Sequence, residues 1–178
     1  LIGLKVFPVV ILGGLDSVLG AIVGGLIVGV VENLAAGYLD PLVGGGTKDF
    51  YGGALVGEPL DTTPLSGVTS YEPSELVITA LAGTTLAELE ATLAERNQYL
   101  AFEPPRFNAS GTIGGMVAAG LSGPARASVG SVRDYVLGAT LLNGRAELLT
   151  FGGQVMKNVA GYDVSRVLAG SLGVLGVI

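Results

Sequence analysis

The chain has 178 residues, a net charge of -6 and an isoelectric point near 4.5. This length allows one domain with a hydrophobic core, alone or with a short appended segment, and the acidic balance excludes a nucleic-acid surface. The chain contains no cysteine and no histidine. Disulfides, iron–sulfur ligation, a thiol nucleophile, a Ser-His-Asp triad and the usual zinc ligands are therefore excluded, and we expect no metal site. Demanding chemistry would have to come from a bound cofactor or from another chain.

The N-terminal part of the chain is apolar, and Asp16 is its only charged residue between Val6 and Val31. Asp16-Ser17 is typical of a helix start and Gly37 of a helix end, so the sequence predicts a helix over residues 17–36. A helix of about 20 residues is long enough to cross a bilayer core, and this one carries two small-xxx-small patterns. A buried helix or strand pair in a soluble core is the alternative. We favour a membrane segment because apolar residues occupy every face.

Residues 44–53 read Gly-Gly-Gly-Thr-Lys-Asp-Phe-Tyr-Gly-Gly, and half of them are glycine. Consecutive glycines can turn successive N–H groups into one concavity, and Thr47 and Lys48 beside such a nest suit a phosphate or pyrophosphate. The spacing is not that of a Walker loop. A glycine run taken alone is more often a flexible turn, so this assignment depends on the rest of the chain.

The following residues predict alternating strands and helices, in an α+β arrangement. Residues 64–68 and 76–80 are expected to form two strands around a turn at 72–75, and residues 99–102 a short strand. Thr85 and Glu88 form a capping-box pattern, with Leu86, Leu89 and Leu93 along one side of a helix that runs to about Arg96.

A second glycine-dense block covers residues 111–123, where Gly114 and Gly115 are expected to open a short helix. Backbone donors at the start of that helix would be available to an anion. The alternative is a tight helix entry packed on a sheet. Residues 135–142 and 146–151 around Asn143-Gly144 predict a hairpin. Asp163 is expected to cap a helix that ends at Leu168, and the last residues read as a strand.

The sequences of these segments resemble the FAD-binding domain of the p-cresol-methylhydroxylase (vanillyl-alcohol-oxidase) flavoproteins. Within this family, they resemble the FAD-binding subunits of bacterial glycolate oxidases. The resemblance runs from about residue 44 to Ile178. The matching motifs are residues 44–52, 101–105, 111–115, 120–124, 133–138 and 157–178. It implies a truncated α+β FAD-binding domain over residues 44–178, without a C-terminal substrate domain and preceded by an apolar helical segment, residues 1–43.

The resemblance also implies which residues hold the cofactor. They are Gly44, Gly45, Gly46, Thr47 and Lys48 around the diphosphate, Gly111, Thr112, Ile113, Gly114, Gly115, Gly120, Leu121, Ser122 and Gly123 near the flavin and its phosphates, and Gly176, Val177 and Ile178 lining the cofactor. FAD is expected to be noncovalent, because covalent attachment in these enzymes uses histidine or cysteine. Arg126 is open between a phosphate contact and a surface role, whereas Lys157 and Arg166 are expected to be solvated or structural.

The activity implied by the resemblance is flavin-mediated oxidation of a 2-hydroxy acid such as glycolate to its 2-oxo acid. Electrons would leave through partner subunits, namely the flavin subunit and the iron–sulfur subunit of a glycolate oxidase. No residue of the chain is identified as the catalytic base. We therefore expect the chain alone to bind FAD weakly and not to turn over glycolate.

Residues 1–50 resemble instead the permease subunit of a branched-chain amino-acid ABC transporter, and both resemblances include residues 44–50. This overlap indicates a chimera, joined either by an assembly error or by natural recombination. Pro41, Leu42 and Val43 are then a short substitute for a strand that precedes the glycine loop in the flavoprotein family. A transporter fragment and an inert chimera are the competing interpretations. The expected location is cytoplasmic, with inner-membrane association through residues 17–37 as a further expectation.

Overall fold

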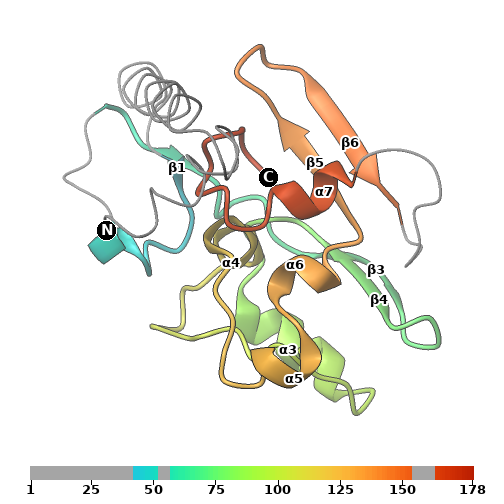
Figure 1. Ribbon diagram of the computed structural model, residues 1–178. Coiled ribbons are helices and arrows are strands. Elements are labelled where there is room, and N and C mark those ends of the chain that lie inside the picture. The colour runs from blue at the N-terminus through green and yellow to red at the C-terminus, as the bar shows by residue number, and fades with distance from the viewer. Residues whose placement is uncertain (1–41, 52–56, 154–162) are drawn as a thin grey trace, which may run out of the picture. The chain divides into compact units, whose positions relative to one another are not determined.

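The computed structural model describes residues 42–51, 57–153 and 163–178, and these belong to one compact unit, Pro41–Ile178 (Figure 1). The predicted apolar helix over residues 17–36 lies outside the described residues. So does most of the permease-like segment, of which the structure describes residues 42–50. None of the helices that the structure describes is long and apolar enough to span a bilayer.

Among the residues that the structure describes, strands occur as three separate pairs. In the first pair, β1 and β2 run parallel with Leu42 opposite Leu60, so a short strand does precede the first glycine loop. The other two pairs are antiparallel hairpins. The strands are β1 (Leu42–Val43), β2 (Leu60–Asp61), β3 (Val68–Glu72), β4 (Val77–Ala80), β5 (Gly138–Leu142) and β6 (Leu148–Gly152).

The first predicted hairpin forms, but its first strand was placed too early. β3 begins at Val68, where the predicted strand ends, and Pro64 lies in a turn in which the amide of Leu65 donates to Thr62 O at 3.2 Å. Val68, Thr69 and Tyr71 are the β-branched and aromatic residues that favour a strand. The turn after Glu72 and the strand over residues 76–80 are confirmed, with β4 starting at Val77.

Helix α3 (Leu86–Ala94) confirms the strongest helical pattern in the sequence. Thr85 is its N-cap, and its hydroxyl oxygen accepts from the amide of Glu88 at 3.1 Å. Leu86, Leu89 and Leu93 are all buried, as their spacing predicts. The core next to Leu86 is formed by Phe102, Met116, Val117 and Val132, so α3 shares it with the two helices α4 (Ile113–Ala119) and α6 (Val132–Tyr135).

Phe102 is 2 % exposed, but residues 99–102 do not form the predicted strand. They follow α3 as a loop that closes in a turn, where the amide of Glu103 donates to Leu100 O at 3.1 Å. Phe102 is buried and Tyr99 is exposed, and a short apolar run does not by itself distinguish a strand from a packed loop.

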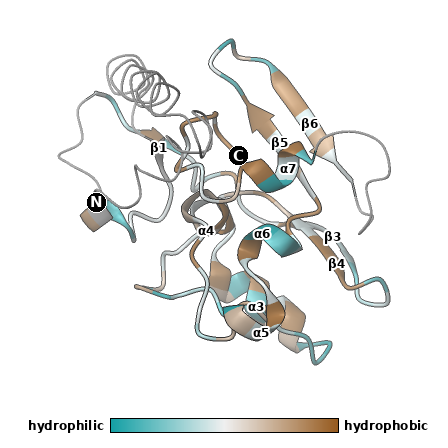
Figure 2. Cartoon of the chain, viewed as in Figure 1, coloured by the Kyte–Doolittle hydropathy of each residue, from teal (hydrophilic) through white to brown (hydrophobic). Residues whose placement is uncertain are grey.

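The C-terminal elements are the β5–β6 hairpin and two short helices, α5 (Arg126–Val129) and α7 (Val164–Val167). The hairpin is confirmed around Asn143, whose side-chain oxygen accepts from the amides of Arg145 and Glu147. Its first strand starts at Gly138, because Tyr135 belongs to α6. Figure 2 shows hydrophobic residues along β6, of which Leu148 is 74 % exposed. The predicted C-terminal strand is reduced to one bridge between Val177 and Leu142.

Asp163 occupies the N-cap position of α7, as predicted, but its side chain does not cap the helix backbone. Instead Oδ1 accepts from the hydroxyl of Ser165, and Oδ2 forms an ion pair with Arg166 at 2.9 Å. Arg166, expected to be solvated or structural, is thus held in an ion pair, whereas Lys157 lies outside the described residues.

Candidate functional site

The candidate site is built where two glycine segments that are far apart in the sequence come into contact. We call residues 44–48 the first glycine loop and residues 111–115 the second glycine segment. A Cβ on Gly44 would lie 2.8 Å from Thr112 Oγ1, and a Cβ on Gly45 would run into the carbonyl group of Ser110. The hydroxyl of Ser110 donates to Gly45 O at 2.6 Å, with Asn108 Oδ1 as its alternative acceptor. Glycine at positions 44 and 45 therefore allows the two segments to meet.

The first glycine loop presents unpaired backbone donors. Within the part of the chain that the structure describes, the amides of Gly45, Gly46 and Thr47 donate to no protein acceptor. Gly46 has φ +62, a left-handed conformation that glycine adopts readily and that turns successive N–H groups toward a common side. The loop thus has the free donors that an anion requires.

The amides at the start of α4 are engaged within the protein, although the sequence predicts them to be available to an anion. The amide of Ile113 donates to Thr84 O at 2.9 Å and that of Gly114 to Ala82 O at 2.7 Å. The amide of Gly115 donates to its own N-cap, Thr112 Oγ1, at 3.2 Å. The donors at the start of α4 are used to fix the helix against residues 82–84. The amides of Ile113, Gly114 and Gly115 are therefore not available to an anion, and the second glycine segment supports the first glycine loop.

Lys48 is the cation of the site. Its ammonium group donates to Thr47 Oγ1 at 3.2 Å and would lie 3.7 Å from a Cβ on Gly115, so it reaches the second glycine segment. Partial burial lowers the pKa of Lys48 below its ordinary value of 10.5. The exposed carboxylate of Asp49 faces Gly46, where a Cβ would lie 3.4 Å from Oδ2. A bound anion would repel this carboxylate, which is free to rotate into solvent.

The remaining predicted residues lie at the other end of α4 and are not in contact with the first glycine loop. Gly120 ends α4 with φ +63 and packs against Gly170. Ser122 Oγ accepts from the amide of Val132, and the amide of Gly123 donates to Phe102 O. Leu121, between them, is partly buried. The amides of Gly120 and Gly123 are thus engaged inside the protein, and the Ser122 side chain links the end of α4 to α6.

The C-terminal residues Gly176, Val177 and Ile178 lie beside β5. Val177 exchanges two backbone hydrogen bonds with Leu142, and Ile178 packs against the core that includes Met116 and Val117. A seven-residue helix is about 10 Å long, so the two ends of α4 are separated by roughly that distance. Arg126, whose role was left open, begins α5.

Sequence analysis missed the residues just before the second glycine segment. Ser110 and Asn108 hold the first glycine loop, and Phe107 lies next to Lys48. The Asn-x-Ser pattern, which is typical of a local side-chain turn, was the available signal.

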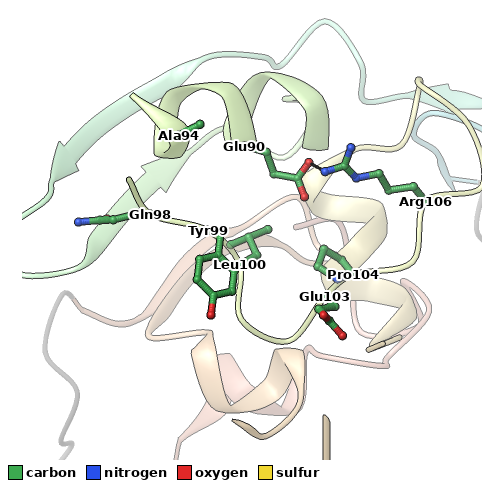
Figure 3. Close-up of a pocket in the computed structure, with 8 residues that line it drawn as sticks. All are labelled: Glu90, Ala94, Gln98, Tyr99, Leu100, Glu103, Pro104 and Arg106. Atoms are coloured by element: carbon green, nitrogen blue, oxygen red, sulfur yellow. Dashed lines mark hydrogen bonds and ion pairs between the residues drawn. The ribbon is translucent and has the colours of Figure 1, made fainter. Parts of the chain in front are cut away.

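A pocket of about 340 Å³ lies elsewhere, between α3 and the loop that follows it (Figure 3). It is lined by Glu90, Ala94, Gln98, Tyr99, Leu100, Glu103, Pro104 and Arg106. Glu90 and Arg106 form an ion pair across its rim. The pocket contains no glycine-loop residue, so we assign the site from loop geometry and free donors and not from cavity size.

Comparison with known proteins decides the family. Residues 41–152 match the family model described as the FAD binding domain. The chain belongs to this family. It is 51 % identical over 140 residues to the glycolate oxidase subunit GlcE of Escherichia coli (strain K12), covering 78 % of this chain and 40 % of that protein. It is 30 % identical over 134 residues to a D-lactate dehydrogenase of Anaerostipes hadrus, covering 75 % of this chain and 27 % of that protein.

A solved structure of an alkyldihydroxyacetonephosphate synthase has the same fold, with a TM-score of 0.59 and 22 % sequence identity over 81 % of this chain and 27 % of that chain. The predicted p-cresol-methylhydroxylase-type FAD-binding fold is thus confirmed. The chain spans well under half the length of these relatives.

The residues of the first glycine loop fit FAD. The diphosphate of FAD carries negative charge and accepts hydrogen bonds, and the loop offers unpaired amides, a hydroxyl and an ammonium group at one place. Residues 110–112 pack against Gly44 and Gly45, which leaves no room for side chains at these two positions. FAD is therefore the cofactor of this domain, in agreement with the family.

Proposed function

We propose that the chain is the FAD-binding portion of a flavin-dependent oxidoreductase that acts on 2-hydroxy acids, with glycolate as the leading substrate. The observation that carries this proposal is the joined pair of glycine segments in a domain of the FAD-binding family. Two named relatives, a glycolate oxidase subunit and a D-lactate dehydrogenase, support the substrate class.

In this proposal, each part of the site has a separate task. The amides of Gly45, Gly46 and Thr47 bind the diphosphate, and Lys48 balances its charge. The second glycine segment holds the loop in the binding conformation through Ser110 and Thr112. Bound FAD supplies the hydride acceptor for oxidation of the substrate. The chain has no histidine, and we propose that proton removal from the substrate falls to another protein segment or subunit.

We further propose that the chain acts with other glycolate oxidase subunits, one carrying flavin and one carrying iron–sulfur clusters. Similarity to the glycolate oxidase subunit GlcD of Bacillus subtilis (strain 168), at 27 % identity over 114 residues, supports a common multi-subunit context. The permease-like residues 1–43, joined to an FAD-binding domain over residues 44–178, would place the assembly in the cytoplasm at the inner membrane. Fractionation with and without detergent tests this location, and a chain recovered without detergent in the soluble fraction contradicts membrane association.

The proposed function is tested by titrating the purified chain with FAD and following flavin absorbance and fluorescence. We expect weak binding that leaves part of the chain without FAD. We also expect no bleaching of the flavin absorbance when glycolate is added anaerobically to the chain alone. Coexpression with the flavin and iron–sulfur subunits should give glycolate-dependent dye reduction that requires this chain. A chain that binds no FAD at about 100 µM contradicts the cofactor assignment. Reduction of dye by D-lactate but not by glycolate contradicts the substrate assignment.

A further inference from the structure

Two exposed aromatic side chains lie beside the first glycine loop. The rings of Phe50 and Phe107 are in edge-to-face contact, with centroids 5.2 Å apart and planes at 62°. Phe50 is 65 % exposed and Phe107 is 48 % exposed, and neither belongs to the core around Phe102. Such a pair of phenylalanines at the surface leaves apolar ring area in water, which an aromatic ligand could cover.

The fold places this pair next to the diphosphate-binding groups by two connections. Phe50 lies in the 3-10 helix Asp49–Tyr51 that continues directly from the first glycine loop. Phe107 precedes Asn108 and Ser110, and the Ser110 hydroxyl donates to Gly45 O. Both rings are thereby attached to the loop, one through the chain and the other through a hydrogen bond.

Lys48 joins the aromatic pair to the anion-binding groups. Its ammonium group lies 6.0 Å from the centroid of the Phe107 ring and also donates to Thr47 Oγ1. The positive charge therefore lies beside both the Thr47 hydroxyl of the first glycine loop and the Phe107 ring. A ligand that matches this order has a phosphate group next to a flat aromatic base, which is the arrangement in a nucleoside diphosphate.

We propose that Phe50 and Phe107 form the binding platform for the adenine of FAD. This inference rests on the FAD-binding role proposed above and assigns one end of the cofactor to named side chains. Adenine stacks on aromatic rings without base-specific hydrogen bonds, and substitution of a stacking aromatic by alanine weakens binding about tenfold or more.

The test measures equilibrium dissociation constants of FAD, FMN and ADP for the wild-type chain and for Phe50→Ala and Phe107→Ala. Flavin fluorescence reports FAD and FMN, and ADP is measured by its competition with FAD. We expect each substitution to weaken FAD and ADP about tenfold or more, and to change FMN, which lacks adenine, less than about twofold. Phe107→Tyr keeps the ring and should bind all three ligands as the wild type does.

Tyr99→Ala is the matched control, because Tyr99 is a 78 % exposed aromatic residue of the separate pocket. It should change none of the three constants. Equal weakening of FAD and FMN in the phenylalanine variants would overturn the proposal, since the platform would then hold the flavin ring or support the fold. Unchanged FAD affinity would overturn it as well. Failure of the wild-type chain to bind any of the three ligands would overturn the FAD-binding role together with this inference.

Discussion

Replacing Gly45 by alanine should separate the two glycine segments. A Cβ at this position would run into the carbonyl group of Ser110 and would lie 3.1 Å from Gly111 N. Both partners are backbone atoms, so no side-chain rotation relieves the overlap. Forcing a methyl group into a filled space costs about 1–3 kcal/mol, and loss of the Ser110 hydrogen bond to Gly45 O costs about 0.5–1.5 kcal/mol more.

A total near 2–3 kcal/mol should lower the melting temperature by about 4–12 °C for a chain of this size. The same displacement misaligns the free amides of Gly46 and Thr47. We therefore expect the FAD dissociation constant to rise at least about tenfold, which corresponds to about 1.4 kcal/mol. Thermal unfolding followed by circular dichroism and titration of FAD fluorescence measure the two effects.

Gly144→Ala is the control for this experiment, because a Cβ on Gly144 would meet nothing within 4 Å. It should leave both the melting temperature and FAD affinity unchanged. If Gly45→Ala keeps wild-type affinity for FAD, the contact between the two segments does not shape the diphosphate site. The assignment of the first glycine loop would then be wrong.

Two further predictions concern the charge of Lys48 and the buried side of α3. FAD affinity should be full below the pKa of Lys48 and fall as pH rises through it, starting below 10.5 because burial lowers that pKa. Lys48→Arg, which stays protonated, should show no such fall in titrations at increasing pH, and an identical fall in both proteins would exclude Lys48 as its cause. Leu89→Ala should lower the free energy of unfolding by about 2–5 kcal/mol in urea, since Leu89 is 3 % exposed. Leu76→Ala, at a 75 % exposed position, should change it little, and equal effects would contradict the assigned core.

Local patterns in the sequence predicted several elements because those elements depend on neighbouring residues. The spacing of Leu86, Leu89 and Leu93 with Thr85 as cap determined α3, and Asn143 determined the turn of the β5–β6 hairpin. The order of the glycine motifs also indicated the FAD-binding family, which the comparison confirmed. Short strands were less predictable, since β3 is four residues later than expected and residues 99–102 form a loop.

Only the tertiary structure decided how the glycine segments divide their tasks. From the sequence, both segments are predicted to be glycine runs with free backbone donors. The spacing of residues does not show which amides donate to an acceptor far away in the chain. The fold brings Thr84 O and Ala82 O to the amides of Ile113 and Gly114, which removes them as anion donors. It also places Ser110 against Gly45, 65 residues away in the chain, and Phe107 against Phe50. Such contacts arise from the packing of loops whose own residues have no strong local preference, so the sequence by itself determined the cofactor family and the tertiary structure determined the site.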